Sequence, residues 1–377
     1  MEKLENIVLI GPVYPYKGGI AHYTGLLYKN LSQKYHVTAI SYKLQYPKFL
    51  YKKEQKDFSN ETLKIEDAQF LIHSANPFNW IKSAKAIKKM APQIVIIQWW
   101  HPYFAPCYWM MRKFLGKIKV IYSCHNVFPH ERFPMDRLLT KLVLKNGDGF
   151  IVHSEKDAAD LQSIKKHAKY MKTALPSFSL FNTGNMSQEK ARKLLNIDVN
   201  DKVILFFGMV RPYKGLQYLL KAFARIRNKE NAKLMIAGSF GGDKQVYMDM
   251  IAKENLQDRV IIDDAYIPDT EVEKYFQACN LVVLPYVSAT QSAVVQTAFD
   301  FEKPVIVTNV GGLPEVVLDG RTGYVVPAES SDALAKKIDE YFEKDKEQEF
   351  VKNIKSEAYK YSWDRMRECI EKLYTMM

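Results

Sequence analysis

Short, continuously apolar segments alternate along the chain with longer segments whose apolar residues recur at helical spacing. The first short segment, residues 7–10, ends at Gly11-Pro12, and helical spacing follows over residues 20–33. Similar short segments recur at residues 37–40, 94–97, 120–123 and 150–153. Strands covered on both faces are continuously apolar, and strands that alternate with helices form parallel sheets. The first half of the chain therefore predicts a parallel α/β sheet.

The pattern breaks near residue 180 and then restarts. Turn-forming residues without periodicity fill residues 176–185, and residues 216–226 then have the spacing of an amphipathic helix. Strand-like segments follow at residues 203–207, 233–237, 260–262, 281–284 and 305–308. We therefore expect an α/β fold of two doubly wound, Rossmann-like domains, residues 1–180 and 200–361. Two such sheets that face each other would form a cleft, with ligands beyond the carboxyl ends of the strands.

Composition narrows the classes of partner. The 377 residues include 54 Lys and Arg against 42 Asp and Glu, and the formal charge of +12 favours an anionic partner. A phosphorylated substrate, a membrane surface and nucleic acid all satisfy this charge, but no long basic run or recognition motif supports nucleic acid. With 47% hydrophobic and 25% charged residues, the chain is neither disordered nor a disulfide scaffold.

Cysteines and apolar segments indicate the compartment. The four cysteines form no CxxC pair and lie among apolar residues, so we expect buried free thiols in a reducing compartment. The first apolar segment is too short for a secretory signal, and no stretch approaches the ~18 apolar residues that span a bilayer. We therefore expect a soluble or peripheral protein.

Two motifs at strand ends are suited to an anionic ligand. Gly18-Gly19 follows the first strand and opens a helix, where the backbone can approach a ligand and free N–H groups can face an anion. A glycine pair in such a turn is also often purely structural. Arg211 and Lys214 lie between the first strand of the second domain and the next helix. Because Arg offers a planar fork and Lys a point charge to phosphate oxygens, this pair predicts a phosphate-binding site.

Further polar candidates lie at other strand ends. A helix that begins near Ser292 would aim the backbone N–H groups of Ala293 and Val294 at an anion, although serine there can also serve only as an N-cap. His125 and His130 follow a first-domain strand and can line a ligand site, although lone histidines are mostly structural. Asp263-Asp264 lacks a third ligand at a suitable spacing, so no metal site is expected.

Together these motifs resemble the retaining nucleotide-sugar glycosyltransferases of family 4, which have the GT-B fold. The resemblance covers nearly the whole chain, because the motifs occur in the expected order and spacing. They are Gly18-Gly19, His125, Arg211, Lys214-Gly215, Lys303-Pro304-Val305 and Gly311-Gly312-Leu313-Pro314-Glu315. The family also has a C-terminal helix that crosses back to the first domain, and residues 362–377 look like that helix.

The resemblance implies transfer of a sugar from a nucleoside diphosphate sugar to an acceptor, with retained anomeric configuration and no metal or other cofactor. Arg211 and Lys214 would offset the charge of the departing diphosphate, and His125 would orient the sugar. The family-implied base site is the backbone near Tyr266 and Ile267. The expected donor-binding residues are Gly18, Gly19, Tyr266, Gln291, Ser292, Ala293, Val294 and Thr297.

The chain departs from the family pattern in one respect. Family members usually have two glutamates separated by seven residues, which contact the donor sugar and the nucleotide ribose. Counting back from Pro304, those positions are Ala289 and Thr297, and Gln291 and Gln296 are candidate replacements at a different spacing. Two other functions therefore stay open: a sugar-nucleotide epimerase of the same fold, and a non-catalytic partner that binds the donor.

Aromatic and basic residues of the first domain are the candidates for the acceptor side. Residues 42–58 are rich in Tyr, Phe and Lys, and Trp100 and His101 follow another strand; with His130 they complete the acceptor-side candidates. Such a surface suits a sugar or an anionic lipid, and equally a solvated loop packed on its own aromatic rings. We expect a glycan or lipid-linked acceptor, as in polysaccharide biosynthesis, and a cytoplasmic protein that can associate with the inner face of the cell membrane.

Overall fold

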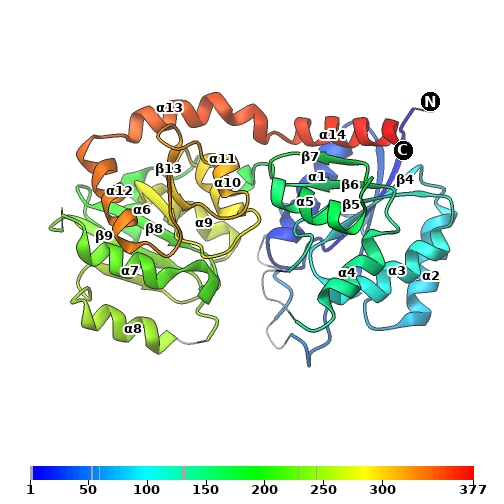
Figure 1. Ribbon diagram of the computed structural model, residues 1–377, viewed down its shortest axis with the longest axis horizontal. Helices are drawn as coiled ribbons and strands as arrows, with labels where there is room; N and C mark the ends of the chain where they lie inside the picture. Colours follow the sequence, from blue (N-terminus) through cyan, green and yellow to red (C-terminus); the bar gives the residue numbers. More distant parts are fainter. Residues whose placement is uncertain (1–2, 52–53, 59, 130–132, 228, 243) are drawn as a thin grey trace. The chain divides into compact units, whose positions relative to one another are not determined.

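The computed structural model describes every residue except 1–2, 52–53, 59, 130–132, 228 and 243 (Figure 1). The chain forms two compact units. Unit 1 comprises Met1–Pro176 and Ser362–Met377, and unit 2 comprises Ser177–Tyr361. The chain therefore passes from one unit to the other after Pro176 and returns after Tyr361.

Unit 1 is built on a seven-stranded sheet in which neighbouring strands are parallel, in the order β3-β2-β1-β4-β5-β6-β7. The strands are β1 (Asn6–Ile10), β2 (His36–Leu44), β3 (Gln69–His73), β4 (Ile94–Trp99), β5 (Lys119–Cys124), β6 (Gly149–Val152) and β7 (Tyr170–Lys172). The five strands expected from the apolar segments are confirmed. The pattern misses the edge strands β3 and β7, because most of their residues are only partly buried and neither is continuously apolar.

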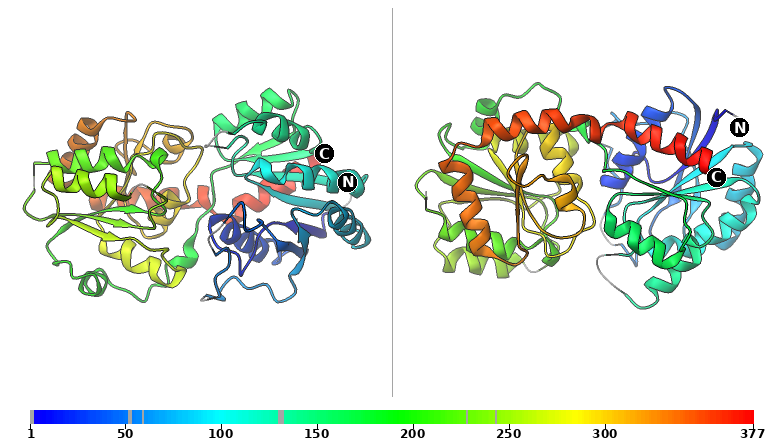
Figure 2. Two further views of the ribbon diagram at one scale, coloured as in Figure 1. Left: turned by 90° about the horizontal axis from the view of Figure 1, so that it is seen from below. Right: turned by 45° about the horizontal axis from the view of Figure 1, so that its top comes forward.

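Helices cover both faces of this sheet (Figure 2). They are α1 (Gly19–Leu31), α2 (Pro77–Lys89), α3 (Ala105–Leu115), α4 (Asp136–Leu144), α5 (Glu155–Ile164) and α14 (Trp363–Met376), with a short 3₁₀ turn η1 (Pro102–Phe104). A helix is present in the expected residues 362–377, and the Ser362 side chain caps its start by accepting from the Arg365 backbone N–H. Helix α14 packs on unit 1, where its Trp363 ring lies 5.2 Å from the ring of Tyr23.

Unit 2 has a six-stranded parallel sheet in the order β10-β9-β8-β11-β12-β13. The strands are β8 (Lys202–Phe207), β9 (Ala232–Ala237), β10 (Val260–Asp263), β11 (Leu281–Leu284), β12 (Val305–Thr308) and β13 (Gly323–Val326). The first five are those expected from the apolar segments. Strand β13 is missed, because it begins at a glycine and offers only three apolar residues.

The helices of unit 2 begin with one in the segment that joins the two expected domains. The α-helices are α6 (Gln188–Leu194), α7 (Leu216–Arg225), α8 (Lys244–Lys253), α9 (Val272–Ala278), α10 (Ala293–Asp300), α11 (Leu313–Val316), α12 (Ser331–Glu343) and α13 (Glu347–Glu357), with 3₁₀ turns η2 (Ser179–Phe181), η3 (Pro212–Lys214), η4 (Asp269–Glu271) and η5 (Ala358–Tyr361). Residues 180–200, which join the two expected domains, include α6. That short helix begins where the Ser187 side chain accepts a hydrogen bond from the Lys190 backbone N–H.

Three expectations from the sequence concern the cysteines, membrane-spanning segments and metal ligands. Cys107, Cys124, Cys279 and Cys369 are free and buried, which confirms the first. Within the described part of the chain, no helix is both long and apolar enough to cross a membrane. Among those same residues, no group of three or more His, Cys, Asp or Glu side chains is placed to hold a metal ion.

Candidate active site

Each sheet reverses its strand order once, between β1 and β4 in unit 1 and between β8 and β11 in unit 2. Loops that leave neighbouring strands at such a reversal turn to opposite faces of the sheet. They leave a crevice beyond the carboxyl ends of the strands, where ligands bind. In unit 2 this crevice lies between residues 208–215, which contain Arg211 and Lys214, and residues 285–292, which contain Gln291 and Ser292.

The two loops of unit 2 are held together at short range. Gly215 has a φ of +70°, and a Cβ there would collide with the carbonyl oxygen of Pro285. The Val287 backbone N–H donates to the Tyr213 carbonyl oxygen at 2.7 Å. Only glycine permits both this backbone conformation and this close approach. The loops after β8 and β11 therefore form one surface.

A third loop, after β12, joins this surface. Gly311 has a φ of +53°, and a Cβ on it would collide with the Ala289 carbonyl oxygen. The Gly312 backbone N–H donates to the Thr290 carbonyl oxygen at 2.8 Å, and the Gln291 amide donates to the Gly312 carbonyl oxygen at 3.1 Å. The glycine pair in the Gly311–Glu315 motif thus packs against the polar run after β11.

Arg211 and Lys214 bring two positive charges to this surface. The Lys214 Nζ lies 3.1 Å from where a Cβ of Gly208 would be, at the end of β8, and the Arg211 side chain lies over Gly241. Neither side chain has an ion-pair partner among the described residues. Burial and the neighbouring Arg211 charge lower the pKa of Lys214 to about 8. The unliganded surface therefore holds a cation that lacks a counter-charge.

Tyr286 connects this cation pair to the start of α10. The Lys214 Nζ lies 5.8 Å from the centre of the Tyr286 ring, and the Ser292 hydroxyl hydrogen-bonds the Tyr286 side chain. Ser292 is the N-cap residue of α10, but its side chain makes no capping hydrogen bond to the helix. The first turn at Ala293 and Val294, which carries a partial positive charge, therefore has no capping hydrogen bond from Ser292.

The other predicted donor-binding residues of unit 2 lie in different settings. Thr297 is buried on α10, and its hydroxyl donates to the Ala293 carbonyl oxygen at 3.0 Å. Gln291 supports the Gly312 turn, as described above. Tyr266 follows the edge strand β10, two strands away from β8, and is 42% exposed. The structure thus brings Arg211, Lys214 and residues 291–294 together but sets Tyr266 apart on the edge strand.

The crevice of unit 1 contains Gly18 and Gly19. Gly18 has a φ of +97°, and a Cβ on either glycine would meet no atom within 4 Å, so both border open space. A pocket of about 170 Å³ lies here, and both glycines line it together with Trp100, which follows β4. Three of the predicted residues thus share one pocket of unit 1.

His125 lies at the carboxyl end of β5 in a neutral environment. Its Nε2 hydrogen-bonds the Gln98 Oε1 at 2.8 Å, and its ring lies 4.5 Å from the Tyr23 ring in an edge-to-face arrangement. Burial and the nearby His153 hold the pKa of His125 well below its ordinary value. His125 is therefore suited to hydrogen bonding as a neutral imidazole.

The acceptor-side candidates include two histidines, His101 and His130. The His101 Nδ1 accepts a hydrogen bond from the Tyr103 backbone N–H at 3.1 Å, which caps η1, and its ring stacks on Phe133. Burial lowers the pKa of His101. His130 lies outside the described residues.

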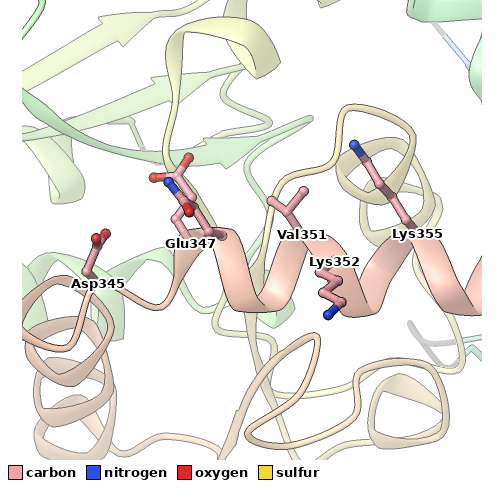
Figure 3. A pocket seen from close by; sticks show the side chains of 6 residues that line it. Asp345, Glu347, Val351, Lys352 and Lys355 are labelled. Atoms are coloured by element: carbon pink, nitrogen blue, oxygen red, sulfur yellow. The ribbon is translucent and has the colours of Figure 1, made fainter.

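A larger pocket, of about 640 Å³, lies along α13 and belongs to a different edge of unit 2 (Figure 3). Its wall includes Glu347 and Lys355, which contact Asn280 just before β11 and Glu302 shortly before β12. These are the amino ends of the strands. The pocket is therefore remote from the carboxyl edge that carries Arg211 and Lys214.

Two protein-family models match the chain and meet near the boundary between the units. The model described as Glycosyltransferase Family 4 matches residues 17–169, and the model described as Glycosyl transferases group 1 matches residues 187–361. The chain therefore contains a family 4-type glycosyltransferase domain followed by a group 1-type glycosyltransferase domain. The expected pair of Rossmann-like parallel sheets is confirmed.

Curated relatives of these two domains are distant. An uncharacterized glycosyltransferase of Methanocaldococcus jannaschii is 30% identical over 187 residues, which cover 48% of this chain and 47% of that protein. The D-inositol 3-phosphate glycosyltransferase of Corynebacterium glutamicum is 26% identical over 256 residues, which cover 62% of this chain and 61% of that protein. The chain thus spans about half to three fifths of these curated relatives.

Solved structures resemble the two-domain chain along nearly all of its length. Anabaena HepE in complex with UDP-glucose has a TM-score of 0.78 at 16% identity and covers 99% of this chain and 100% of its own. Sucrose-phosphate synthase from Thermosynechococcus elongatus has a TM-score of 0.74 at 20% identity, and the match covers 99% of this chain and 98% of that protein. At these identities the likeness establishes the fold alone.

Sequence reasoning misses two glutamines of the family 4 domain. Gln98 is fully buried in β4 and hydrogen-bonds His125, and Gln45 follows β2 and lines the pocket beside Gly18. A single glutamine within the otherwise apolar Ile94–Trp99 is a signal that could have drawn attention to Gln98, since a buried amide needs partners. No comparable local signal marks Gln45.

Proposed function

We propose that the chain transfers a sugar from a nucleoside diphosphate sugar to a glycan or lipid-linked acceptor, with retention of anomeric configuration and without a metal ion. This proposal concerns the donor, the reaction and the stereochemistry. The GT-B fold alone does not determine them, because one fold hosts many activities.

The observation that carries the proposal is the uncompensated cation pair of unit 2. Arg211 and Lys214 lie at the strand reversal where α/β sheets bind ligands. The lowered pKa of Lys214 means that its charged form is destabilised in the unliganded chain. A diphosphate placed between these side chains and the first turn of α10 would supply the missing negative charge.

Relatives support this choice of donor. HepE, whose fold this chain resembles, has been solved with UDP-glucose, and the curated relatives are named as glycosyltransferases. A nucleoside diphosphate sugar combines the anionic group that the Arg211–Lys214 surface suits with a sugar ready for transfer. It is therefore the ligand class we assign to unit 2.

In the proposed reaction, the bond between the anomeric carbon and the phosphate oxygen breaks on the face where the acceptor oxygen forms the new bond. The acceptor hydroxyl proton passes to the departing diphosphate, and the configuration is retained. Arg211, Lys214 and the α10 N-terminus act where negative charge develops in the transition state. The neutral imidazole of His125 would orient the transferred sugar by hydrogen bonding.

Ligand binding and transfer can be measured separately. The chain is screened by thermal shift with UDP-, GDP-, ADP- and dTDP-sugars without added metal and with EDTA. A stabilising donor is then tested for transfer, and the anomeric configuration of the product is read by NMR. No stabilisation by any donor would refute the proposed function, and an inverted product would refute retention.

Two variants and a matched control test the cation pair. We expect Arg211→Ala and Lys214→Ala each to lower the transfer rate by about 100–1000-fold, because each removes a charge that stabilises the leaving group. Lys221→Ala removes an exposed cation from α7 in the same unit and should leave transfer unchanged. Wild-type transfer by both site variants would contradict the assignment.

A further inference from the structure

Gln98 is a polar residue inside a strand that is otherwise apolar. It is fully buried in β4, whose remaining residues are apolar and also buried. Its Oε1 lies 2.8 Å from the Nε2 of His125, the residue that follows β5. Because β4 and β5 pair in parallel, this contact lies at the carboxyl edge of the sheet of unit 1. His125 is only partly buried, so the contact joins the sheet interior to a residue nearer the surface.

Stability alone does not account for a glutamine at this position. The Gln98 Nε2 is buried and has no hydrogen-bond partner among the described residues. A buried amide with one unsatisfied end costs free energy, which offsets what its single hydrogen bond contributes. The glutamine is therefore better explained by the effect of its oxygen on His125.

The backbone after β1 leaves room for this side chain. A Cβ on Gly11 would lie 2.7 Å from the Gln98 Cγ and 2.8 Å from the Thr24 Oγ1. Protein interiors are close-packed, so a larger residue in place of Gly11 would displace Gln98 or Thr24. The glycine thus keeps Gln98 in a position from which its oxygen reaches His125.

His125 is held at three points. Its backbone N–H donates to the Trp99 carbonyl oxygen at 2.9 Å, and its ring meets the Tyr23 ring edge to face, with ring centres 4.5 Å apart. These two contacts place the ring but do not determine which ring nitrogen carries the proton. The third contact, from the Gln98 oxygen, reaches a ring nitrogen.

The Gln98 oxygen determines where the proton lies. An amide oxygen can only accept a hydrogen bond, so the Nε2 of a neutral His125 carries the proton and Nδ1 carries the lone pair. Burial and the nearby His153 hold the pKa of His125 well below its ordinary value, so the ring is neutral at pH 7. Burial also lowers the pKa of His153 to about 4 and raises the pKa of Tyr23, so these two neighbours are uncharged as well.

We propose that Gln98 is a positioning residue for His125, because it holds the imidazole proton on Nε2 and leaves the lone pair on Nδ1. The imidazole then has one defined donor and one defined acceptor when it orients the transferred sugar. The inference rests on the proposed function, because it assigns His125 to that sugar. Gln98 acts through His125 and does not itself touch the substrate.

NMR of the unliganded chain with isotope-labelled histidine locates the proton without requiring transfer. The His125 ring should show a protonated Nε2 and an unprotonated Nδ1, and His125→Gln, which removes the ring, assigns the signals. Gln98→Met keeps the length of the side chain but has no oxygen, so exchange of the Nε2 proton with water should become roughly tenfold faster. Gln98→Glu keeps an acceptor and should retain slow exchange.

Transfer separates a positioning role from a merely structural one. Gln98→Met should lower kcat about tenfold, while the donor KM and the thermal shift by UDP stay as in wild type. Gln98→Glu should raise the pKa of His125, since a carboxylate favours the imidazolium, and its activity should return as the pH rises above that pKa. Gln33→Met, at an exposed position of the same unit, is the control and should match wild type throughout.

The results distinguish this inference from the proposed function. A proton found on Nδ1 in wild type, equally slow exchange in Gln98→Met, or wild-type kcat in Gln98→Met would each overturn the role of Gln98. The proposed function would stand in those cases if transfer is observed. If Gln98→Met does not fold, the position of the proton in wild type and the pH profile of Gln98→Glu decide. A Gln98-dependent Nε2 proton in a chain that binds no nucleoside diphosphate sugar would support the contact and defeat the proposed function.

Discussion

Replacing Lys214 by methionine is expected to make the unliganded chain more stable while removing its donor binding. The two side chains have similar length, but methionine carries no charge. Lys214 packs beside Gly208, and the charge of Arg211 acts on its pKa. Folding thus lowers the pKa of Lys214 from 10.5 to about 8, mainly through burial, which means that folding disfavours the charged form.

The lowered pKa sets the size of the effect. At 1.36 kcal/mol for each unit, a change from 10.5 to about 8 corresponds to at most about 3 kcal/mol of the free energy of unfolding. Lys214 is partly exposed, so solvent screening reduces this figure, and we expect a gain of about 1 kcal/mol in Lys214→Met. For a unit of this size the melting temperature should rise by about 2–4 °C.

The dependence on pH identifies the cause. Below pH 8 the lysine is charged in both the folded and the unfolded chain, and the full destabilisation is present. Between pH 8 and 10.5 the folded chain loses the proton first, so the destabilisation declines and is gone above pH 10.5. The advantage of Lys214→Met over wild type should therefore be clear at pH 7 and nearly absent at pH 10.

Thermal unfolding at both pH values, with and without UDP, measures these effects. UDP should raise the melting temperature of wild type and leave that of Lys214→Met almost unchanged. Lys221→Met, at an exposed position on α7, is the matched control and should match wild type in both respects. If Lys214→Met is less stable than wild type at pH 7, or if its advantage persists at pH 10, the reasoning is wrong.

Three other perturbations test separate parts of the chain. Gly311→Ala should destabilise unit 2 by more than about 1 kcal/mol in urea unfolding and weaken UDP binding, because the new Cβ collides with a backbone carbonyl at positive φ. Burial raises the pKa of Asp300 to about 7, so the stability of wild type relative to Asp300→Asn should fall as pH rises from about 4 to 7, as pH-dependent unfolding would detect. Phe49 and Leu50 are 78% and 53% exposed, and their joint replacement by serine should reduce sedimentation with anionic liposomes at low salt; no sedimentation of wild type would contradict the expected membrane association.

The sequence predicts strands best where both faces of the strand are buried. Strand β4 is buried at every position and reads as a continuous apolar run, whereas the edge strand β7 has no buried residue and gives no such run. The candidate site follows the same logic. Motifs that lie next to a strand in the sequence, such as Gly18-Gly19 and Arg211, can be placed from that strand.

Contacts between distant residues could not be predicted in this way. Gln98 and His125 are 27 positions apart, and they meet only because β4 and β5 pair in parallel. Gln45 reaches the pocket beside Gly18 only because β2 pairs with β1. Strand order and register decide such contacts, and apolar periodicity contains no information about which strands become neighbours.

The positions at which the family pattern has glutamates bear on the charge of the site. Ala289 is buried, with its carbonyl against the Gly311 turn, and the Thr297 hydroxyl is bound to the Ala293 carbonyl. Neither position supplies a negative charge to offset Arg211 and Lys214. The overall charge of +12 alone favours several classes of anionic partner. Arg211 and Lys214 instead mark one place on unit 2 where an anion can bind. Because two cations at a partly buried site attract the more highly charged diphosphate of UDP more strongly than the monophosphate of UMP, UDP should bind more tightly than UMP, and the difference should narrow as salt is added.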